Sequence, residues 1–305
     1  MNKPSIAPLV VCAFNRAAVL QRTLSALAAA DLAPVTPLYI FIDGPRANVD
    51  DDKTKVDEVI KVARNIAGFK SVDIMVSDTN KGLAASIIGA ATAILNDHQR
   101  VIMVEDDLYC SKSFLRYMNT MLDRFEHDQR VMQVSGYGCR ITPPSDYQYD
   151  VYLNRRAHSW SWATWADRWN TVDWQVSDFD QLASNKKAIK AFNRYGSDLF
   201  GMLKRWKTGA NNSWYIRFNY SMHKQQRYAV CPVRSLVRND GFGDDATNCA
   251  AYNRYKVDFE DEHHGDFSLP NQTPSLQPRE DIIRDAVKYW SWTYRIYGYI
   301  MTKLK

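Results

Sequence analysis

Residues 101–118 read VIMVEDDLYCSKSFLRYM, and this stretch decides the fold that we expect. It begins as an apolar run of strand length and continues into three consecutive carboxylates, Glu105, Asp106 and Asp107, here called the acidic triplet. Adjacent anions at the end of a buried strand repel one another unless a cation joins them. Their oxygen atoms suit Mg²⁺ or Mn²⁺, which usually share such sites with substrate phosphates. The alternative is a solvated acidic turn that caps the next helix.

The chain around this stretch alternates between strand-like and helix-like segments. Apolar runs of strand length cover residues 5–14, 37–43, 72–78, 100–107 and 130–136. Apolar residues at helical spacing lie between them, over 20–30, 56–66, 83–95 and 114–125. Repeated β-α units with fully apolar strands predict an α/β fold, a Rossmann-like and mostly parallel sheet covered by helices.

Sheets of this kind bind ligands beyond the carboxyl ends of their strands. The polar residues that follow the predicted strands are therefore candidates for a site. They are Asn15 with Arg16, Asp43 with Gly44, residues 78–82, and the acidic triplet. We expect all four groups to converge on one rim.

The alternation ends near Gly136, which divides the chain into three parts. Residues 1–136 form a ligand-binding α/β half by this prediction, because the candidate rim lies in it, and residues 137–256 form a second half of the same domain. Residues 257–305 form a polar arm followed by a basic, aromatic helix.

Composition excludes several classes of protein. The 305 residues carry a net charge of +5 that is not gathered into a stripe, so we expect no nucleic-acid partner. The first predicted strand-to-helix turn, AFNRAAVLQRTL (13–24), contains no glycine, which argues against a P-loop or a dinucleotide-binding turn. Five scattered cysteines, no signal peptide and no apolar stretch of about 20 residues predict a cytoplasmic protein with reduced thiols.

Several motifs resemble the N-acetylglucosaminyltransferase I group, and more distantly bacterial family 2-like sugar transferases of surface polysaccharide pathways. VEDDL followed by SKSFLRYM is similar to the metal-site region of that group. Other matching pieces occur in the same order: VVCAFNRAAVLQRTLSAL (10–27), IFIDGPR (40–46), NKGLAASIIGA (80–90), HSWSWATW (158–165) and PVRSLVRNDGFG (232–243). The resemblance implies a GT-A fold with a C-terminal acceptor-side lobe.

The resemblance also implies roles for individual residues. Asp107 would ligate a divalent metal, Mn²⁺ or Mg²⁺, while Glu105 and Asp106 would contact the sugar and ribose. Donor-binding residues on the rim would be Asn15, Arg16, Asp43, Lys81 and Gly82. For Asp43 the alternative is a turn residue before Gly-Pro, and for Lys81 and Gly82 it is a simple turn.

Trp160 and Trp162 would close over the donor sugar by the same resemblance. Tryptophans at this density also occur in cores and lobe interfaces, and that alternative stays open.

Two positions depart from the family pattern. An acidic general base is expected just before Trp214, but Asn211, Asn212 and Ser213 stand there. Asn212 thus occupies the catalytic position without a carboxylate, and Asp173, Asp178 and Asp180 are alternative bases. The second departure is Asn248, which stands where related sequences place a histidine that would ligate the metal.

The basic, aromatic C-terminal segment has two interpretations. It could pack on the main domain as a final helix. It could instead lie at a membrane surface, with Trp290, Trp292, Tyr294 and Tyr297 at headgroup depth and Lys288, Arg295, Lys303 and Lys305 facing anionic lipid.

The resemblance therefore predicts a metal-dependent glycosyltransferase, hexosyl or N-acetylhexosaminyl. It would move a sugar from a nucleoside diphosphate sugar, uridine-linked, to a glycan or lipid-linked acceptor in bacterial surface polysaccharide synthesis. The alternatives are a non-catalytic nucleotide- or carbohydrate-binding protein on the same scaffold, and a nucleotidyltransferase. We expect it in the cytoplasm, and the second interpretation of the C-terminal segment would make it peripheral to the inner face of the plasma membrane.

Overall fold

The computed structural model describes residues 6–240, 255, 257–271 and 276–303. Ten strands are found in that part of the chain. They are β1 (Leu9–Ala13), β2 (Pro37–Ile42), β3 (Ser71–Val76), β4 (Arg100–Glu105), β5 (Leu108–Cys110), β6 (Val131–Ser135), β7 (Val151–Asn154), β8 (Trp162–Trp165), β9 (Tyr228–Pro232) and β10 (Val237–Asn239).

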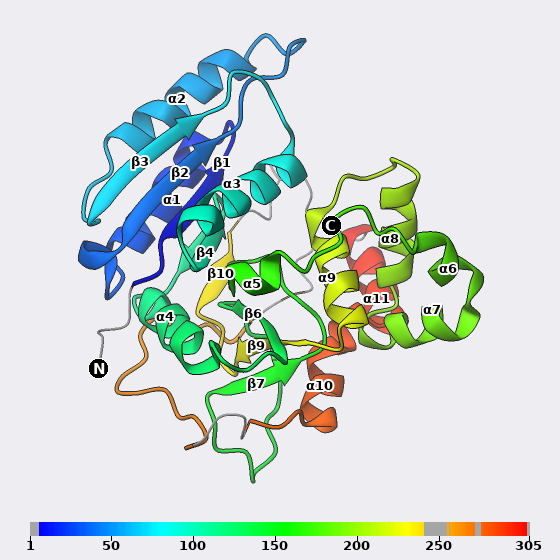
Figure 1. The fold of residues 1–305 in the computed structure, drawn as a ribbon. Helices are drawn as coiled ribbons and strands as arrows, with labels where there is room; N and C mark the ends of the chain where they lie inside the picture. Colours follow the sequence, from blue (N-terminus) through cyan, green and yellow to red (C-terminus); the bar gives the residue numbers. More distant parts are fainter. Residues whose placement is uncertain (1–5, 241–254, 256, 272–275, 304–305) are drawn as a thin grey trace.

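The helices cover both faces of the sheet and build a second lobe (Figure 1). They are α1 (Ala17–Ala28), α2 (Asp52–Arg64), α3 (Leu83–Asp97), α4 (Phe114–Phe125), α5 (Ala166–Trp169), α6 (Phe179–Ser184), α7 (Lys186–Phe192), α8 (Leu199–Lys207), α9 (Trp214–Lys224), α10 (Glu280–Val287) and α11 (Trp292–Lys303). Short 3₁₀ turns occupy η1 (Ala33–Val35), η2 (Asn193–Tyr195) and η3 (Lys288–Trp290).

Eight strands form one sheet in the order β3-β2-β1-β4-β8-β6-β9-β7. The first four strands are all parallel, as the alternation of apolar runs and helices predicts. β8 then enters antiparallel between β4 and β6, while β9 runs parallel to β6 and antiparallel to β7. The prediction of an α/β fold with a mostly parallel, helix-covered sheet is confirmed, and the antiparallel insertions make the sheet mixed.

One apolar core runs through both halves of the sheet and reaches the C-terminal region. β1, β6, β7 and β8 are buried along their whole length, and β4 is buried as far as Val104. Ile282, Ala286 and Trp290 belong to the same core, so α10 is part of the main domain. The four described cysteines, Cys12, Cys110, Cys139 and Cys231, are buried free thiols.

A second, smaller core holds the lobe made by α6 to α9. Its buried side chains are Val176, Phe179, Leu182, Phe192, Leu199, Leu203, Ile216 and Tyr220. Arg156, which follows β7 and is 1% exposed, joins this lobe to the sheet through two hydrogen bonds of 2.9 Å to the Asp198 carboxylate. Gly196 lies so close to the guanidinium that an added Cβ would stand 1.9 Å from Arg156 Nη1.

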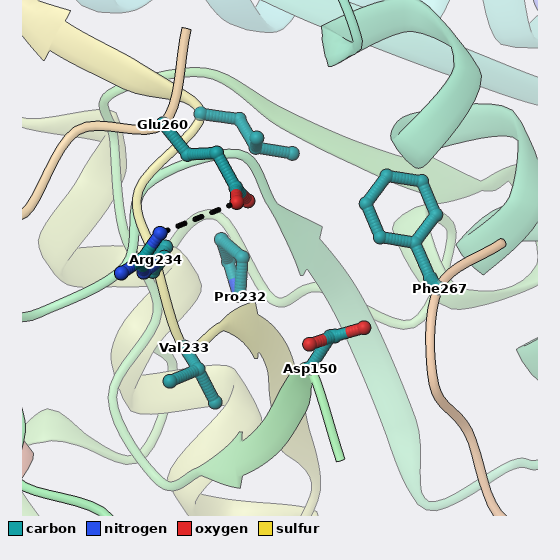
Figure 2. A pocket seen from close by; sticks show the side chains of 7 residues that line it. Asp150, Pro232, Val233, Arg234, Glu260 and Phe267 are labelled. Atoms are coloured by element: carbon teal, nitrogen blue, oxygen red, sulfur yellow. Dashed lines mark ion pairs between the residues drawn. The ribbon is translucent and has the colours of Figure 1, made fainter. Parts of the chain in front are cut away.

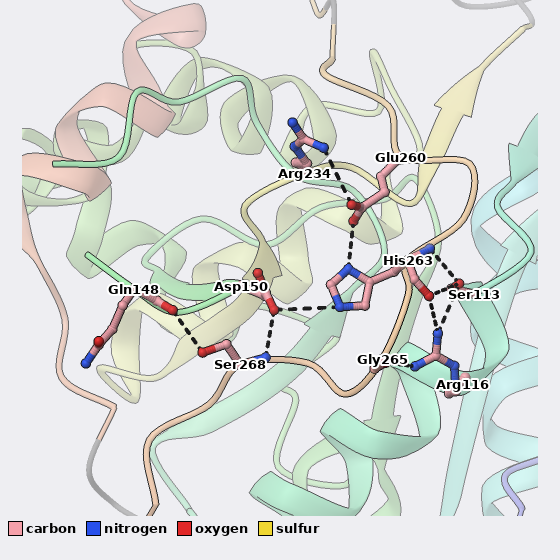
Figure 3. A network of polar contacts seen from close by, with 9 residues as sticks. All are labelled: Ser113, Arg116, Gln148, Asp150, Arg234, Glu260, His263, Gly265 and Ser268. Carbon is pink, nitrogen blue, oxygen red and sulfur yellow. Dashed lines mark hydrogen bonds and ion pairs between the residues drawn. The ribbon is translucent and has the colours of Figure 1, made fainter. Parts of the chain in front are cut away.

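The arm that follows the sheet is fastened to it by polar contacts (Figure 3). His263 Nδ1 lies 3.2 Å from Glu260 Oε2, and the imidazole ring stacks on Phe267 with centroids 4.4 Å apart. The backbone nitrogen of Ser268 donates to Asp150 at 2.6 Å, and Arg116 donates to the carbonyl of Gly265 at 2.6 Å. Residues 258–268 are therefore a fixed part of the domain.

The Arg156–Asp198 pair gives a testable prediction. Burial raises the pKa of Asp198, but the charge and hydrogen bonds of Arg156 outweigh it and leave that pKa below its ordinary value. The pair therefore stabilises the protein above the ordinary pKa of aspartate, and this contribution is lost as the pH falls through the lowered pKa. Asp198→Asn should cost about 3–5 kcal/mol at neutral pH, because it leaves a buried guanidinium without its counter-charge.

Urea unfolding at pH 7 and at pH 3 measures both effects. At pH 7 the free energy of unfolding should be lower in the variant than in the wild type. Between pH 7 and pH 3 the free energy of unfolding should decrease less in the variant than in the wild type. Equal stability of the two proteins at pH 7 would contradict the assignment.

Candidate functional site

The register of the parallel strands brings the predicted rim residues together. Cys12 of β1 is paired with Glu105 of β4, and Ala13 of β1 is paired with Ile42 of β2. The residues that follow these strands, Asn15 with Arg16, Asp43, and Asp106 with Asp107, therefore leave the sheet at one edge (Figure 1).

Arg16 lies directly against the acidic triplet. Its guanidinium forms an ion pair with Asp106, and its Nη2 atom lies 3.2 Å from Asp107 Oδ2. The Thr23 hydroxyl of α1 donates to the backbone carbonyl of Asp106 at 2.6 Å, which ties the triplet to the same helix. The turn after β1 thus supplies the positive charge for the end of β4.

One arginine does not balance three carboxylates at this strand end. Loss of hydration and the charges of Asp107 and Asp106 raise the pKa of Glu105 to about 8. Loss of hydration also raises the pKa of Asp106 to about 6, although Arg16 opposes the shift. The site therefore favours an additional positive charge.

The residues present fit a divalent cation in charge and in donor type. Carboxylate oxygens are the ligands that Mg²⁺ and Mn²⁺ prefer, and such ions usually complete their coordination with phosphates and water. In the described part of the chain, no three acidic, His or Cys side chains form a ready-made metal cluster. Asp107 would thus be the protein ligand within that part, and Asn248, the other predicted ligand, lies outside the described residues.

Asp43 holds the neighbouring loop in place. It is 6% exposed, and its carboxylate accepts hydrogen bonds from the Asn80 side chain at 3.1 Å and from the backbone nitrogens of Lys81 and Gly82 at 2.8 and 2.9 Å. Gly44 also donates to it at 3.0 Å. The turn interpretation left open for Asp43 thus describes its contacts, and the donor-binding role expected for Asp43 would have to be fulfilled in addition to these hydrogen bonds.

The same contacts locate Lys81 and Gly82. Their backbone N–H groups point to Asp43, while the Lys81 side chain is exposed. Gly44 packs against the loop so closely that an added Cβ would lie 2.5 Å from the carbonyl carbon of Thr79. The loops after β2 and β3 therefore form one unit on the rim.

A second buried carboxylate, Asp52 at the start of α2, was not predicted from the sequence. Asn15 donates to it at 3.0 Å and Arg46 Nη2 at 2.8 Å, so Asn15 positions this loop on the rim. Hydrogen bonds from Arg46 and Asn15 hold the pKa of Asp52 well below its ordinary value, against its loss of hydration. Arg46 also lies over the Phe14 ring, 5.5 Å from its centroid. The position of Arg46 in the IFIDGPR motif was the one sequence feature that pointed to this group of contacts.

The two candidate tryptophans separate in depth. Trp162 is 1% exposed and packs on Trp169 and Trp214, so the core alternative describes it. Trp160 precedes β8, whose first residue Trp162 is paired with Met103 of the antiparallel strand β4, so Trp160 lies toward the edge of the sheet where β4 ends. Trp160 is only partly buried and contacts Tyr137 and Tyr255 edge to face. Trp160 is therefore the aromatic side chain on the rim.

The alternative bases lie in the second lobe. Asp173 accepts hydrogen bonds from Ser177 and Gln175 within its own turn. Asp178 accepts from the Tyr220 hydroxyl at 2.9 Å and pairs with Lys224. Asp180 is exposed on α6, and this helix lies at the outer side of the lobe, well separated from β4 in Figure 1. The described contacts of Asp173 are local to its turn, and Asn212 is exposed just before α9.

A separate cavity of about 110 Å³ lies between the arm and the end of β9 (Figure 2). Its lining residues are Asp150, Pro232, Val233, Arg234, Leu236, Glu260 and Phe267. None of the predicted site residues lines it, and its volume is well below the roughly 300 Å³ of ordinary ligand pockets. The candidate site is thus the rim.

Comparison with known proteins yields structural likeness alone. No protein family model and no curated protein sequence matches the chain. Residues 1–349 of S. aureus TarS align at 10% identity over 77% of this chain and 60% of that one, with a TM-score of 0.43. The Pyrobaculum calidifontis mannosyltransferase PcManGT, solved with GDP-Man and Mn²⁺, aligns at 12% identity over 73% of this chain and 70% of its own, with a TM-score of 0.37.

Mouse xyloside xylosyltransferase 1 aligns at 10% identity over 72% of this chain and 82% of its own, with a TM-score of 0.38. The chain spans less than two thirds of the TarS fragment. Likenesses at this level carry no argument about activity, so the function has to be argued from the rim.

The Asp43 contacts give the second prediction. Asp43→Asn replaces one acceptor oxygen by an NH₂ group that faces backbone N–H donors, which should cost about 1–3 kcal/mol of stability. Amide hydrogen exchange should become faster at residues 80–82 in particular. The matched control is Asp78→Asn, an exposed residue of the same loop. If both variants melt like the wild type, Asp43 does not hold the rim together.

Proposed function

We propose that this protein is a glycosyltransferase that takes a sugar from a nucleoside diphosphate sugar, with uridine as the base. The acceptor is a glycan or a lipid-linked sugar of a bacterial surface polysaccharide pathway. The observation that carries the proposal is the acidic triplet at the end of a buried strand, with Arg16 beside it and Trp160 just before the neighbouring strand β8. The motif resemblance supplies the donor class and the pathway.

The leaving diphosphate is the group that most needs stabilisation in this reaction. A divalent cation held by Asp107 would neutralise the negative charge that develops on it. Arg16 contributes a second positive charge at the same place, because it lies within 3.2 Å of Asp107. Charge placed in advance in this way lowers the barrier without reorganisation during the reaction.

The remaining rim residues bind and orient the donor. Trp160 offers a partly exposed aromatic ring on which a sugar can stack, just before β8 at the edge where β4 ends. Glu105 and Asp106 offer acceptors for sugar and ribose hydroxyls. Asp43, with the 80–82 turn, and Asn15, with Asp52, fix the two loops between which the nucleotide would lie.

The third prediction tests the metal and the carboxylate together. Uridine diphosphate with Mn²⁺ should raise the melting temperature, and saturation at a hundred times the dissociation constant corresponds to about 2.7 kcal/mol. Asp107→Asn should abolish this gain and lower donor turnover by about 10² to 10³, because the leaving group loses its counter-charge. The fold should survive, since the change relieves repulsion within the acidic triplet.

The matched control is Asp73→Asn, an exposed carboxylate of β3 whose loss should change neither quantity. Unchanged donor turnover in Asp107→Asn, with the nucleotide still bound, would remove the metal site from the mechanism. Equal stabilisation by guanosine, cytidine and uridine diphosphates would instead contradict the uridine assignment.

The fourth prediction concerns the acceptor side. Asn212 is exposed immediately before Ser213, whose hydroxyl caps α9 by accepting from Ile216 at 3.3 Å. Asn212→Asp should therefore be tolerated by the fold, since an exposed carboxylate at a helix start is favourable. It should leave turnover unchanged or raise it, because it places a base where the related enzymes have one. Loss of donor turnover with an unchanged melting curve would contradict the assignment of a general base to this position.

A further inference from the structure

The C-terminal segment divides into a buried part and an exposed part. In α10 and η3, Ile282, Ile283, Ala286, Tyr289 and Trp290 are all buried. Their burial corrects the expectation that Trp290 lies at headgroup depth, because this ring is 7% exposed and belongs to the main core. In α11, by contrast, Gly298 is the one residue in the buried class. Any surface role therefore belongs to α11.

Large apolar side chains are concentrated on α11. Six of the ten exposed large hydrophobic residues of the described chain lie on this single helix of 12 residues. Trp292, Ile296, Tyr299 and Ile300 are 64%, 55%, 66% and 48% exposed. Their spacing of four, three and one residues places them on one face of the helix. A solvent-exposed apolar stripe of this kind is typical of a contact site.

The charges on α11 itself have one sign. Its sequence contains Arg295 and Lys303 and no carboxylate, whereas Lys288, just before it, is paired with Asp285 at 2.6 Å. Lys303 lies one turn beyond Tyr299 on the same face, 5.9 Å from its ring centroid. The Arg295 guanidinium lies over the Trp292 ring at 4.8 Å, at the other end of the stripe. The surface is therefore complementary to an anionic one.

We propose that α11 is a docking helix for an anionic lipid surface. Tryptophan and tyrosine, which make up half of the stripe, are the residues that settle at the boundary between lipid headgroups and acyl chains. Twelve residues make a helix of about 18 Å, which can lie flat in that boundary. In the described part of the chain no helix has the length and hydropathy needed to cross a bilayer. A symmetric contact between two copies of the stripe would instead bring the positive charges of α11 from both copies together.

The start of α11 is held firmly on the protein. The Ser197 backbone nitrogen and hydroxyl both donate to the carbonyl of Trp290, at 3.1 and 2.9 Å, and Arg295 donates to the Ser197 hydroxyl at 3.2 Å. The Trp290 ring lies 5.5 Å from Tyr255, which in turn lies 5.7 Å from Trp160. Docking of α11 on a bilayer would thus fix the orientation of the rim relative to it. The use of this orientation for sugar transfer rests on the proposed function, whereas the docking itself does not depend on it.

Vesicle flotation of the full chain tests the proposal. Vesicles of equal parts phosphatidylcholine and phosphatidylglycerol should carry the protein, and vesicles of phosphatidylcholine alone should carry much less. The triple variant Trp292→Ser, Ile296→Ser, Tyr299→Ser should lose at least about tenfold in affinity, because each side chain removes apolar surface from the contact. Lys303→Gln should weaken the binding about fivefold, since one basic residue contributes about 1 kcal/mol near an anionic surface.

The matched control is Val35→Ser with Val76→Ser, which removes two exposed apolar side chains of 48% and 45% exposure elsewhere on the protein. This control should float like the wild type. The proposal is overturned if the wild type does not bind anionic vesicles, or if the triple variant binds them equally well. It is also overturned if light scattering shows a wild-type dimer that the triple variant loses while neither protein binds vesicles.

Donor hydrolysis in solution separates this result from the proposed function. The triple variant should hydrolyse the donor at the wild-type rate, since α11 touches none of the rim carboxylates in its described contacts. Flotation without any donor hydrolysis in the wild type would leave the docking surface standing and remove the glycosyltransferase assignment.

Discussion

Three carboxylates follow one another where a buried strand leaves the sheet, and the protein offsets their repulsion with one arginine from the adjacent strand-to-helix turn. Arg16 reaches Asp106 and Asp107 only because β1 and β4 are parallel neighbours, which places their carboxyl ends side by side. Loss of hydration, together with the charges of Asp107 and Asp106, raises the pKa of Glu105 to about 8. A ligand that brings a cation together with a diphosphate would reduce the repulsion within the acidic triplet, and a neutral ligand would not.

The sequence predicts much of the fold because parallel strands covered on both faces must be apolar throughout. β1 and β4 show this property directly, and the polar residues after them had to meet at one edge. The second half was not predicted in detail. β8 inserts antiparallel between β4 and β6, and this pairing depends on contacts between segments distant in sequence that no local pattern reveals.

Within the site, the sequence predicts which residues lie on the rim better than it predicts their hydrogen-bond partners. Asp43 stands on the rim as expected, but its oxygens accept from the 80–82 turn, and Asn15 donates to Asp52. Such pairings depend on the distance between loops. Trp160 and Trp162 are only two residues apart in the sequence. Their packing alone shows that Trp162 is enclosed by Trp169 and Trp214, while Trp160, before the start of β8, stays partly exposed.

The most direct test of this account is a crystal structure with uridine diphosphate and Mn²⁺, read by anomalous scattering from the metal. The account predicts one metal peak that bridges an Asp107 oxygen and the diphosphate, with Arg16 beside the phosphates and the nucleotide between the loops after β1 and β2. A nucleotide bound elsewhere, or a metal peak that does not contact the acidic triplet, would contradict it.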